Sequence, residues 1–242
     1  MTRPERAMVL AAGLGTRMMP LTEALPKPLI PIAGRPLIDH ALGRLAASGI
    51  AHVVVNTHYL AERLAAHLAG RTGQRITVLH EPALLGTGGG VANALPDLAP
   101  DAGDPPFFVV NADALWRDGP VPALDRLAAA WDETAMDALL LLVPRAAVVG
   151  VAGAGDFHRA ADGRLRRRTG EEVAPCFYAG MQLVHRRLFD DAPDGAFSVV
   201  PLWDRAAVAG RLFGLIHDGA WFHVGTPAAV AETEAALAGT AP

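Results

Sequence analysis

Residues 7–17 read Ala-Met-Val-Leu-Ala-Ala-Gly-Leu-Gly-Thr-Arg, an apolar run that passes into a glycine-rich turn. The apolar half predicts a buried strand, and Gly13 and Gly15 let backbone N–H groups turn toward an anion. A dinucleotide-binding turn would have a third glycine at Met18, and a Walker loop would continue into Gly-Lys-Ser or Gly-Lys-Thr. Neither is present, so the turn indicates a phosphate site that presents Arg17. A bare strand-to-loop turn is the alternative.

Lys27 is the only lysine of the chain, because the 21 Lys and Arg residues comprise 20 arginines and one lysine. Its ammonium is a compact point charge, whereas a guanidinium is a wide planar fork. The flanking Pro26 and Pro28 fix φ and disfavour helix in the residue before them, so we expect Lys27 on a rigid extended segment. Two cations near a glycine turn suit the charge of a phosphoryl group in transfer. Chance survival of one lysine is the alternative.

Short apolar runs alternate with helical patterns along the first half of the chain. Strands are predicted at residues 7–12, 52–55, 75–79, 107–110 and 138–143, and helices at 36–49, 60–68, 89–95 and 124–131. This alternation favours an α/β fold with a mostly parallel central sheet and helices on both faces. Ligands bind beyond the carboxyl ends of such strands, so the loops after residues 12, 55, 79 and 110 should share one functional edge.

The second half of the chain is less regular. Its pattern predicts hairpin strands around Asp162-Gly163, strands at 177–184 and 211–216, and helices at 199–209 and 227–237. The run Arg166 to Arg168 follows the turn, and a solvated hairpin tip explains it better than a nucleic-acid contact. No internal repeat or low-complexity linker divides the chain, so we expect one domain over residues 1–242.

Composition bounds the partners and the compartment. A chain of 242 residues with 51% hydrophobic residues can bury one sizeable core, and a net charge of -4 argues against nucleic acid or a membrane as a partner. No apolar run reaches the ~18 residues of a membrane span, and no signal-peptide pattern occurs. The single cysteine, Cys176, excludes an intramolecular disulfide and fits a reducing cytoplasm. We expect a cytoplasmic monomer or small homo-oligomer.

Residues 10–29, read as L-A-A-G-L-G-T-R-M-x-P-L-T…P-K-P-L, resemble the signature of the sugar-1-phosphate nucleotidyltransferases. Members of that family have a Rossmann-like GT-A fold and use magnesium, and the resemblance implies both here. It also implies that Arg17 stabilises the β- and γ-phosphates of a nucleoside triphosphate and that Lys27 contacts its α-phosphate region. The loop that would hold the triphosphate comprises Leu10, Ala11, Ala12, Gly13, Gly15 and Thr16.

Residues 85–90, Leu-Gly-Thr-Gly-Gly-Gly, match a second segment of the family after the strand at 75–79. Three consecutive glycines mark a close ligand approach or a flexible turn. The resemblance implies a loop that reads the nucleobase through Gly86, Thr87 and Gly88. A looser match at Asn56 implies a place near the nucleoside.

Asn111-Ala112-Asp113 follows the strand at 107–110 and resembles the family's N/G-x-D motif. An aspartate at a strand end suits magnesium, which takes oxygen ligands and often only one or two carboxylates. Asp113 would thus join Arg17 and Lys27 as the catalytic set, with a plain turn aspartate as the alternative. Weaker matches imply a sugar site at Asn111, Asp156 and Gly180, although structural turns explain the last two almost as well.

Residues 221–226, Trp-Phe-His-Val-Gly-Thr, resemble the family's W-x-D-V/I-G-T, but His223 stands where the family has its second metal-binding aspartate. A neutral imidazole is a poor ligand for magnesium and a better one for softer divalent ions. Three arrangements are open. Asp113 holds the metal with substrate phosphates and water, Asp218 reaches in from the preceding loop, or the protein uses another divalent metal or is impaired. We favour the first and keep His223 as a candidate ligand.

The compact length and the segment Gly155-Asp156-Phe157 most closely resemble the N-acetylmuramate 1-phosphate uridylyltransferases of cell-wall peptidoglycan recycling. The resemblance implies uridylyl transfer from UTP to N-acetylmuramate 1-phosphate, with a nucleotide-binding part at roughly residues 1–120 and a smaller sugar-binding β part at roughly 121–226. Mannose-1-phosphate guanylyltransferase is the close alternative. A non-catalytic nucleotide-binding regulatory protein is an alternative of another class. An oxidoreductase is disfavoured, because the loop lacks the third glycine.

Overall fold

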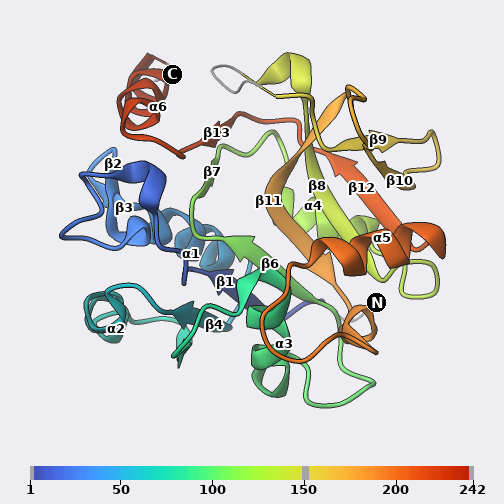
Figure 1. The fold of residues 1–242 in the computed structure, drawn as a ribbon, viewed down its shortest axis with the longest axis horizontal. Helices are drawn as coiled ribbons and strands as arrows, with labels where there is room; N and C mark the ends of the chain where they lie inside the picture. The colour runs from blue at the N-terminus through green and yellow to red at the C-terminus, as the bar shows by residue number, and fades with distance from the viewer. Residues whose placement is uncertain (1–2, 149–152, 240–242) are drawn as a thin grey trace.

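The computed structural model describes residues 3–148 and 153–239. Within these ranges a nine-stranded sheet forms the centre, in the order β10-β9-β11-β6-β1-β4-β5, with β8 paired to β11 and β12 paired to β8 (Figure 1). Its strands are β1 Arg6–Leu10, β4 His52–Thr57, β5 Arg75–His80, β6 Phe107–Asn111, β8 Ala138–Pro144, β9 Phe157–Arg159, β10 Leu165–Arg167, β11 Cys176–Val184 and β12 Leu212–Ile216. Two small sheets join β2 Pro31–Ile32 to β3 Arg35–Pro36 and β7 Ala114–Trp116 to β13 Trp221–His223.

Six α-helices occur in the described part of the chain. They are α1 Leu37–Ala47, α2 Ala61–Ala69, α3 Gly86–Leu98, α4 Ala123–Ala130, α5 Val200–Val208 and α6 Pro227–Gly239, with short 3-10 turns η1 Thr16–Met18, η2 Lys27–Leu29, η3 Arg145–Ala147 and η4 Arg186–Phe189. Every strand and helix predicted from the sequence is present, with ends shifted by a few residues. The hairpin predicted around Asp162-Gly163 is formed by β9 and β10.

Alternating side chains of β1 bury opposite faces of the sheet, as a period of two requires. Ala7 and Val9 pack with α1, α2 and α4, whereas Met8 packs with α3 and α5 on the other face. Pairing is parallel for β1 with β4 and β6, for β4 with β5, and for β8 with β12, while β11 runs antiparallel to β6 and β8. The predicted α/β fold with a mostly parallel sheet and helices on both faces is confirmed.

Parallel pairing brings four strand ends to one edge of the sheet. β1 ends at Leu10, β4 at Thr57, β5 at His80 and β6 at Asn111, so the segments that follow them emerge side by side (Figure 1). The small β7–β13 sheet, which the sequence pattern did not predict, then carries the C-terminal segment back to this edge. Its register pairs His223 with Ala114, the residue after the Asn-Ala-Asp motif.

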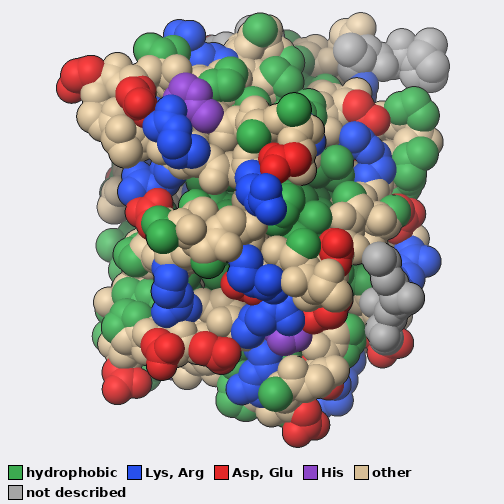
Figure 2. All heavy atoms as spheres, turned by 90° about the vertical axis from the view of Figure 1, so that its right-hand side faces the viewer, with side chains coloured by type: hydrophobic (Ala, Val, Ile, Leu, Met, Phe, Trp, Pro, Cys, Tyr) green, Lys and Arg blue, Asp and Glu red, His purple; other side chains and the backbone are tan. Residues whose placement is uncertain are grey.

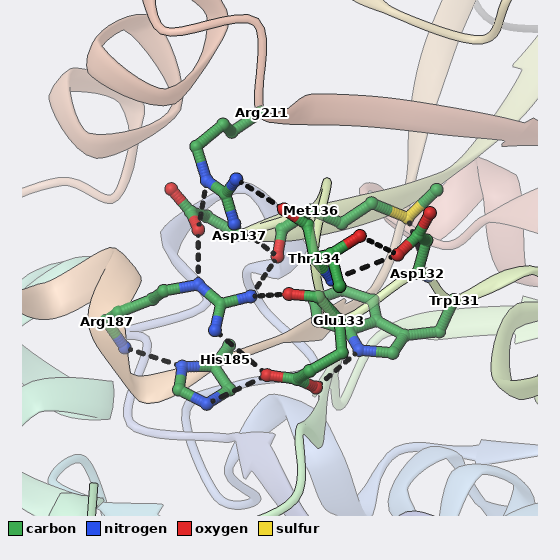
Figure 3. Close-up of polar contacts among 9 residues, drawn as sticks. All are labelled: Trp131, Asp132, Glu133, Thr134, Met136, Asp137, His185, Arg187 and Arg211. Carbon is green, nitrogen blue, oxygen red and sulfur yellow. Dashed lines mark hydrogen bonds and ion pairs between the residues drawn. The ribbon is translucent and has the colours of Figure 1, made fainter. Parts of the chain in front are cut away.

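An ionic cluster ties β8, β11 and β12 together at the opposite edge (Figure 3). Asp137 Oδ1 accepts hydrogen bonds from Arg187 Nε at 2.6 Å and from Arg211 Nε at 2.8 Å. The buried His185 accepts from the Arg187 backbone N–H at 3.1 Å and lies 3.2 Å from Glu133. Burial above all holds the pKa of His185 below its ordinary value, so the ring is neutral here at pH 7. We interpret the cluster as structural, because it lies at the opposite edge of the sheet from the ends of β1, β4, β5 and β6.

The face that carries α5 and the β9–β10 hairpin mixes both signs of charge (Figure 2). Arg166 pairs with Glu172 and Arg167 with Asp204, at 2.7 and 2.6 Å. No helix in residues 3–148 and 153–239 is long and apolar enough to cross a membrane.

Candidate active site

A cavity of about 530 Å³ opens at the edge where β1, β4, β5 and β6 end. Most of the residues predicted to bind nucleotide or to act in catalysis lie on its wall. They are Leu10, Ala11, Ala12, Gly13, Gly15, Thr16, Arg17, Lys27, Asn56, Gly86, Thr87 and Asp113, and the predicted sugar residue Asn111 lines the cavity with them. The predicted residues Gly88, Asp156, Gly180 and His223 are not among those that line it.

The glycine turn after β1 has a backbone that only glycine adopts readily. Gly15 has φ +64°, and a Cβ there would come within 2.9 Å of Thr22 Cγ2 and 3.1 Å of Lys27 Cβ. The Gly15 carbonyl accepts from the Thr22 hydroxyl at 3.0 Å and from the Met18 N–H at 2.9 Å. The turn is therefore closed by its own hydrogen bonds, and Gly15 lets Lys27 approach it closely.

Lys27 and Asp113 form an ion pair across the cavity, with Nζ 2.6 Å from Oδ2. Their side chains are 12% and 29% exposed, so each is held in the wall but faces the opening. The prediction that Lys27 lies on an extended segment is wrong, because Lys27 is the first residue of the 3-10 turn η2. The residue before it, Pro26, does have an extended backbone. Pro28 is tolerated there because the N–H groups of a helix's first turn have no acceptor within the helix, so the N–H that proline lacks is not missed.

Arg17 lies in η1, exposed at the mouth of the cavity. It forms no ion pair with any residue in 3–148 or 153–239, so its guanidinium is available to an anion. Together with Lys27 it makes this edge of the cavity cationic, with Asp113 as the opposing carboxylate. That arrangement suits a polyphosphate that carries a divalent ion.

Glu81 is a residue of the site that the sequence reasoning missed. Its side chain is fully buried, and its Oε1 accepts from Asn56 Nδ2 at 2.7 Å while its Oε2 accepts from the Leu85 N–H at 3.0 Å. Asn56 Oδ1 in turn accepts from the Ala11 N–H at 2.7 Å. This chain of hydrogen bonds links the ends of β1, β4 and β5 to the start of α3. The signal in the sequence was an acidic residue directly after the third strand.

The glycine-rich segment at 86–90 is the first turn of α3 and not the loop that the sequence predicted. The Gly88 and Gly89 N–H groups donate to the Phe197 carbonyl at 2.9 and 3.2 Å, and the Val199 N–H donates to Thr87 Oγ1 at 3.0 Å. A Cβ at Gly88 would collide with the Phe197 ring, so this glycine serves a close backbone approach. Only Gly86 and Thr87 of the predicted set face the cavity.

His223 lies close to the residues predicted to be catalytic, although it does not line the cavity. Burial lowers its pKa, the charge of Asp113 opposes that shift, and the charges of Lys27 and Arg17 support it. Its ring stacks beside Trp221, with centroids 5.9 Å apart. Asp218, the other predicted candidate, instead pairs with Arg126 at 2.7 Å. The structure therefore gives no support to Asp218 as a substitute ligand.

A carboxylate of the cavity can bind a metal ion only through an oxygen that is not already hydrogen-bonded within the protein. Both oxygens of Glu81 are occupied by N–H donors, whereas Asp113 engages Lys27 through Oδ2 alone. No cluster of three or more His, Cys, Asp or Glu side chains fit for a metal occurs within the described ranges. Asp113 thus fits a magnesium site in which substrate phosphates and water supply the other ligands.

Of the three predicted sugar residues, Asn111 lines this cavity, whereas Asp156 and Gly180 do not. Asp156 Oδ2 accepts from the Tyr178 N–H at 2.9 Å at the edge of a second cavity. Gly180 has φ +78° at an irregularity of β11 and packs against Asn111. Tyr178 lines the second cavity and Gly180, two residues further along β11, packs against Asn111 of the first, so the two cavities are near neighbours. Burial, and then the charge of Asp113, raise the pKa of the Tyr178 hydroxyl.

Residues 6–156 match the sequence profile of the nucleotidyl transferase family. The chain belongs to this family. The nucleotidyltransferase is 44% identical over 240 residues to the N-acetylmuramate alpha-1-phosphate uridylyltransferase of Caulobacter vibrioides, a match that covers 97% of this chain and 98% of that protein. It is 41% identical over 111 residues to the mannose-1-phosphate guanylyltransferase of Mycobacterium tuberculosis, 45% of this chain and 30% of that protein.

The fold of the nucleotidyltransferase also resembles that of a UDP-glucose pyrophosphorylase solved with UDP-glucose. The TM-score is 0.79 at 14% identity, covering 98% of this chain and 100% of the other. The resemblance inferred from residues 10–29 is therefore confirmed, and the nucleotidyltransferase is an enzyme of the uridylyltransferase type. The likeness to the guanylyltransferase is partial and weaker.

Proposed function

We propose that this nucleotidyltransferase transfers a uridylyl group from UTP to N-acetylmuramate 1-phosphate and releases pyrophosphate. One observation carries the reaction type: Arg17, Lys27 and Asp113 meet at one glycine-lined cavity, with Lys27 and Asp113 paired at 2.6 Å. The choice of substrates is supported by the uridylyltransferase that matches nearly the whole chain. The role in peptidoglycan recycling and the cytoplasmic location belong to the same proposal.

The reaction is an in-line displacement at phosphorus. An oxygen of the sugar phosphate attacks the α-phosphorus, a new P–O bond forms, and the bond to the bridging oxygen of the β-phosphate breaks as pyrophosphate leaves. The second pKa of a phosphate monoester is about 6, so the nucleophile is already an anion at pH 7 and requires no general base. Catalysis then consists of positioning the two phosphates and neutralising their charge.

The side chains divide this work by their position. Lys27 lies in the wall beside the glycine turn and contacts the α-phosphate, and Arg17 at the mouth holds the β- and γ-phosphates. Asp113 would hold magnesium, or another divalent ion, together with the triphosphate. When bound, that ion neutralises charge on the phosphate oxygens.

The two cavities suggest how the chain is divided between its substrates. The residues that line the first cavity fall within 10–113, apart from Gly225, and those that line the second fall within 156–203. We assign the nucleotide to the part at roughly 1–120 and the sugar to the part at roughly 121–226.

A panel of triphosphates and sugar phosphates tests the proposal by pyrophosphate release. We expect the fastest turnover with UTP and N-acetylmuramate 1-phosphate in magnesium. Faster turnover with GTP and mannose 1-phosphate would assign the enzyme to the guanylyltransferases instead. If no pair releases pyrophosphate in magnesium, manganese or cobalt while UTP still binds in calorimetry, the chain is a non-catalytic nucleotide-binding protein.

A further inference from the structure

The second cavity, of about 620 Å³, lies among the β9–β10 hairpin, β11 and α5 and shares no lining residue with the first. Tyr178 and Trp203 form an aromatic wall, with ring centroids 4.9 Å apart. The Trp203 indole is fixed by a hydrogen bond of 2.9 Å to the buried Gln182. A largely fixed aromatic wall with a few polar groups is typical of a small-molecule site.

Two neighbouring arginines line this cavity, but only one of them is neutralised by the protein. Arg167 makes a bidentate pair with Asp204, with nitrogen–oxygen distances of 2.8 and 2.6 Å, and this hydrogen bonding raises its pKa. Arg168 donates to the Gly170 carbonyl at 2.9 Å. No carboxylate of the described residues lies within ion-pair distance of Arg168.

The half-buried Arg168 therefore has the properties of an anion-binding group. A guanidinium that lines a cavity without a counter-ion can donate a charge-assisted hydrogen bond to a carboxylate or phosphate oxygen. Asp156, on the same wall, has one oxygen on the Tyr178 N–H and is not paired with Arg168. The cavity thus offers an acceptor for sugar hydroxyls and a separate site for an anion.

The position of the cavity distinguishes the possible anions. The phosphate that reacts must lie in the first cavity, at Lys27 and Asp113, which the second cavity does not include. N-acetylmuramate carries a second anion, the carboxylate of its lactyl ether, on a different carbon of the ring from the phosphate. N-acetylglucosamine is the same amino sugar without that acid.

We propose that Arg168 binds the carboxylate of an acidic amino sugar and so selects N-acetylmuramate 1-phosphate over neutral sugar phosphates. This inference deepens the proposed function and depends on it for the identity of the sugar. It also gives a purpose to the run Arg166 to Arg168, in which one arginine pairs with Glu172, one with Asp204, and the third faces the ligand.

The test compares Arg168→Gln with Arg166→Gln, a control on the neighbouring strand β10 that does not line the cavity. Each variant is assayed with N-acetylmuramate 1-phosphate and with N-acetylglucosamine 1-phosphate. Loss of a charge-assisted hydrogen bond predicts that Arg168→Gln raises KM for the acidic sugar about 10- to 100-fold, with kcat and the KM for the neutral sugar within about twofold. Arg168→Lys should recover part of the loss, and Arg166→Gln should behave as wild type.

An equal rise of KM for both sugars would overturn the inference, because Arg168 would then serve the phosphate or a shared hydroxyl. No change for either sugar would overturn it as well. Calorimetry with free N-acetylmuramate and N-acetylglucosamine separates this result from failure of the proposed function, because it needs no turnover. If wild type and Arg168→Gln bind the free acid equally, Arg168 has no role in its recognition, whatever reaction the enzyme performs.

Discussion

Replacing Glu81 by glutamine perturbs the hydrogen-bond network beside the nucleotide cavity without changing its shape. In the native network the Ala11 N–H donates to Asn56 Oδ1 at 2.7 Å, which leaves Asn56 Nδ2 to donate to Glu81 Oε1 at 2.7 Å. The Leu85 N–H donates to Glu81 Oε2 at 3.0 Å. Both oxygens of Glu81 must therefore accept. The substituted glutamine brings an NH₂ group that faces either the Asn56 amide or the Leu85 N–H, and reversing Asn56 only moves the clash to Ala11.

The cost follows from one buried donor left without an acceptor. Such a group costs about 1–3 kcal/mol, and because Glu81 is fully buried no water can replace the missing partner. A loss of about 2 kcal/mol corresponds to a fall in Tm of roughly 4–8 °C for a chain of this size. UTP affinity should fall too, because Ala11 and Asn56 both line the cavity.

A second change should restore the network. In the double variant Asn56→Asp with Glu81→Gln, the new carboxylate accepts from the Ala11 N–H and from the glutamine NH₂, and the glutamine oxygen accepts from the Leu85 N–H. Asn56→Asp alone places two carboxylates face to face and should be the least stable variant at neutral pH. Urea unfolding of all four proteins gives the coupling energy, expected to be about 2 kcal/mol or more in favour of the double variant. Additive losses, or a Glu81→Gln protein as stable as wild type, would refute this reasoning.

Two further predictions concern other parts of the molecule. Asp137→Asn should lower the free energy of urea unfolding by about 1–3 kcal/mol, because a neutral amide oxygen can still accept from Arg187 and Arg211 but no longer offsets the charge of the two guanidinium groups; KM for UTP should stay unchanged, and a raised KM would contradict a purely structural role. His223→Asp should lower the magnesium concentration needed for half-maximal turnover, because a carboxylate beside Asp113 is the better magnesium ligand. An unchanged magnesium dependence or an inactive variant would count against that account of the site.

Much of the fold was predictable because its signals are local. Consecutive apolar residues in β1 indicate a strand buried on both faces, and Pro36 and Gly49 bound the first helix. The turn with Gly15 follows from the need for a backbone that lacks Cβ. By contrast, the 3-10 turn at Lys27 and the helical start at Gly86 depend on tertiary neighbours such as Phe197, which no local pattern reveals.

The glycine turn, Arg17, Lys27 and Asp113 could be named from the chain alone, because strand ends and turn residues carry their own chemistry. Only the tertiary structure paired Lys27 with Asp113, 86 residues apart, and brought Gly88 against Phe197. It also buried Glu81 between Asn56 and Leu85, placed His223 beside Asp113 through the β7–β13 register, and left Arg168 facing a cavity without a counter-ion among the described residues. Local sequence determines what each segment can do. Tertiary packing decides which side chains meet, because it brings segments that are distant in the chain together around one core.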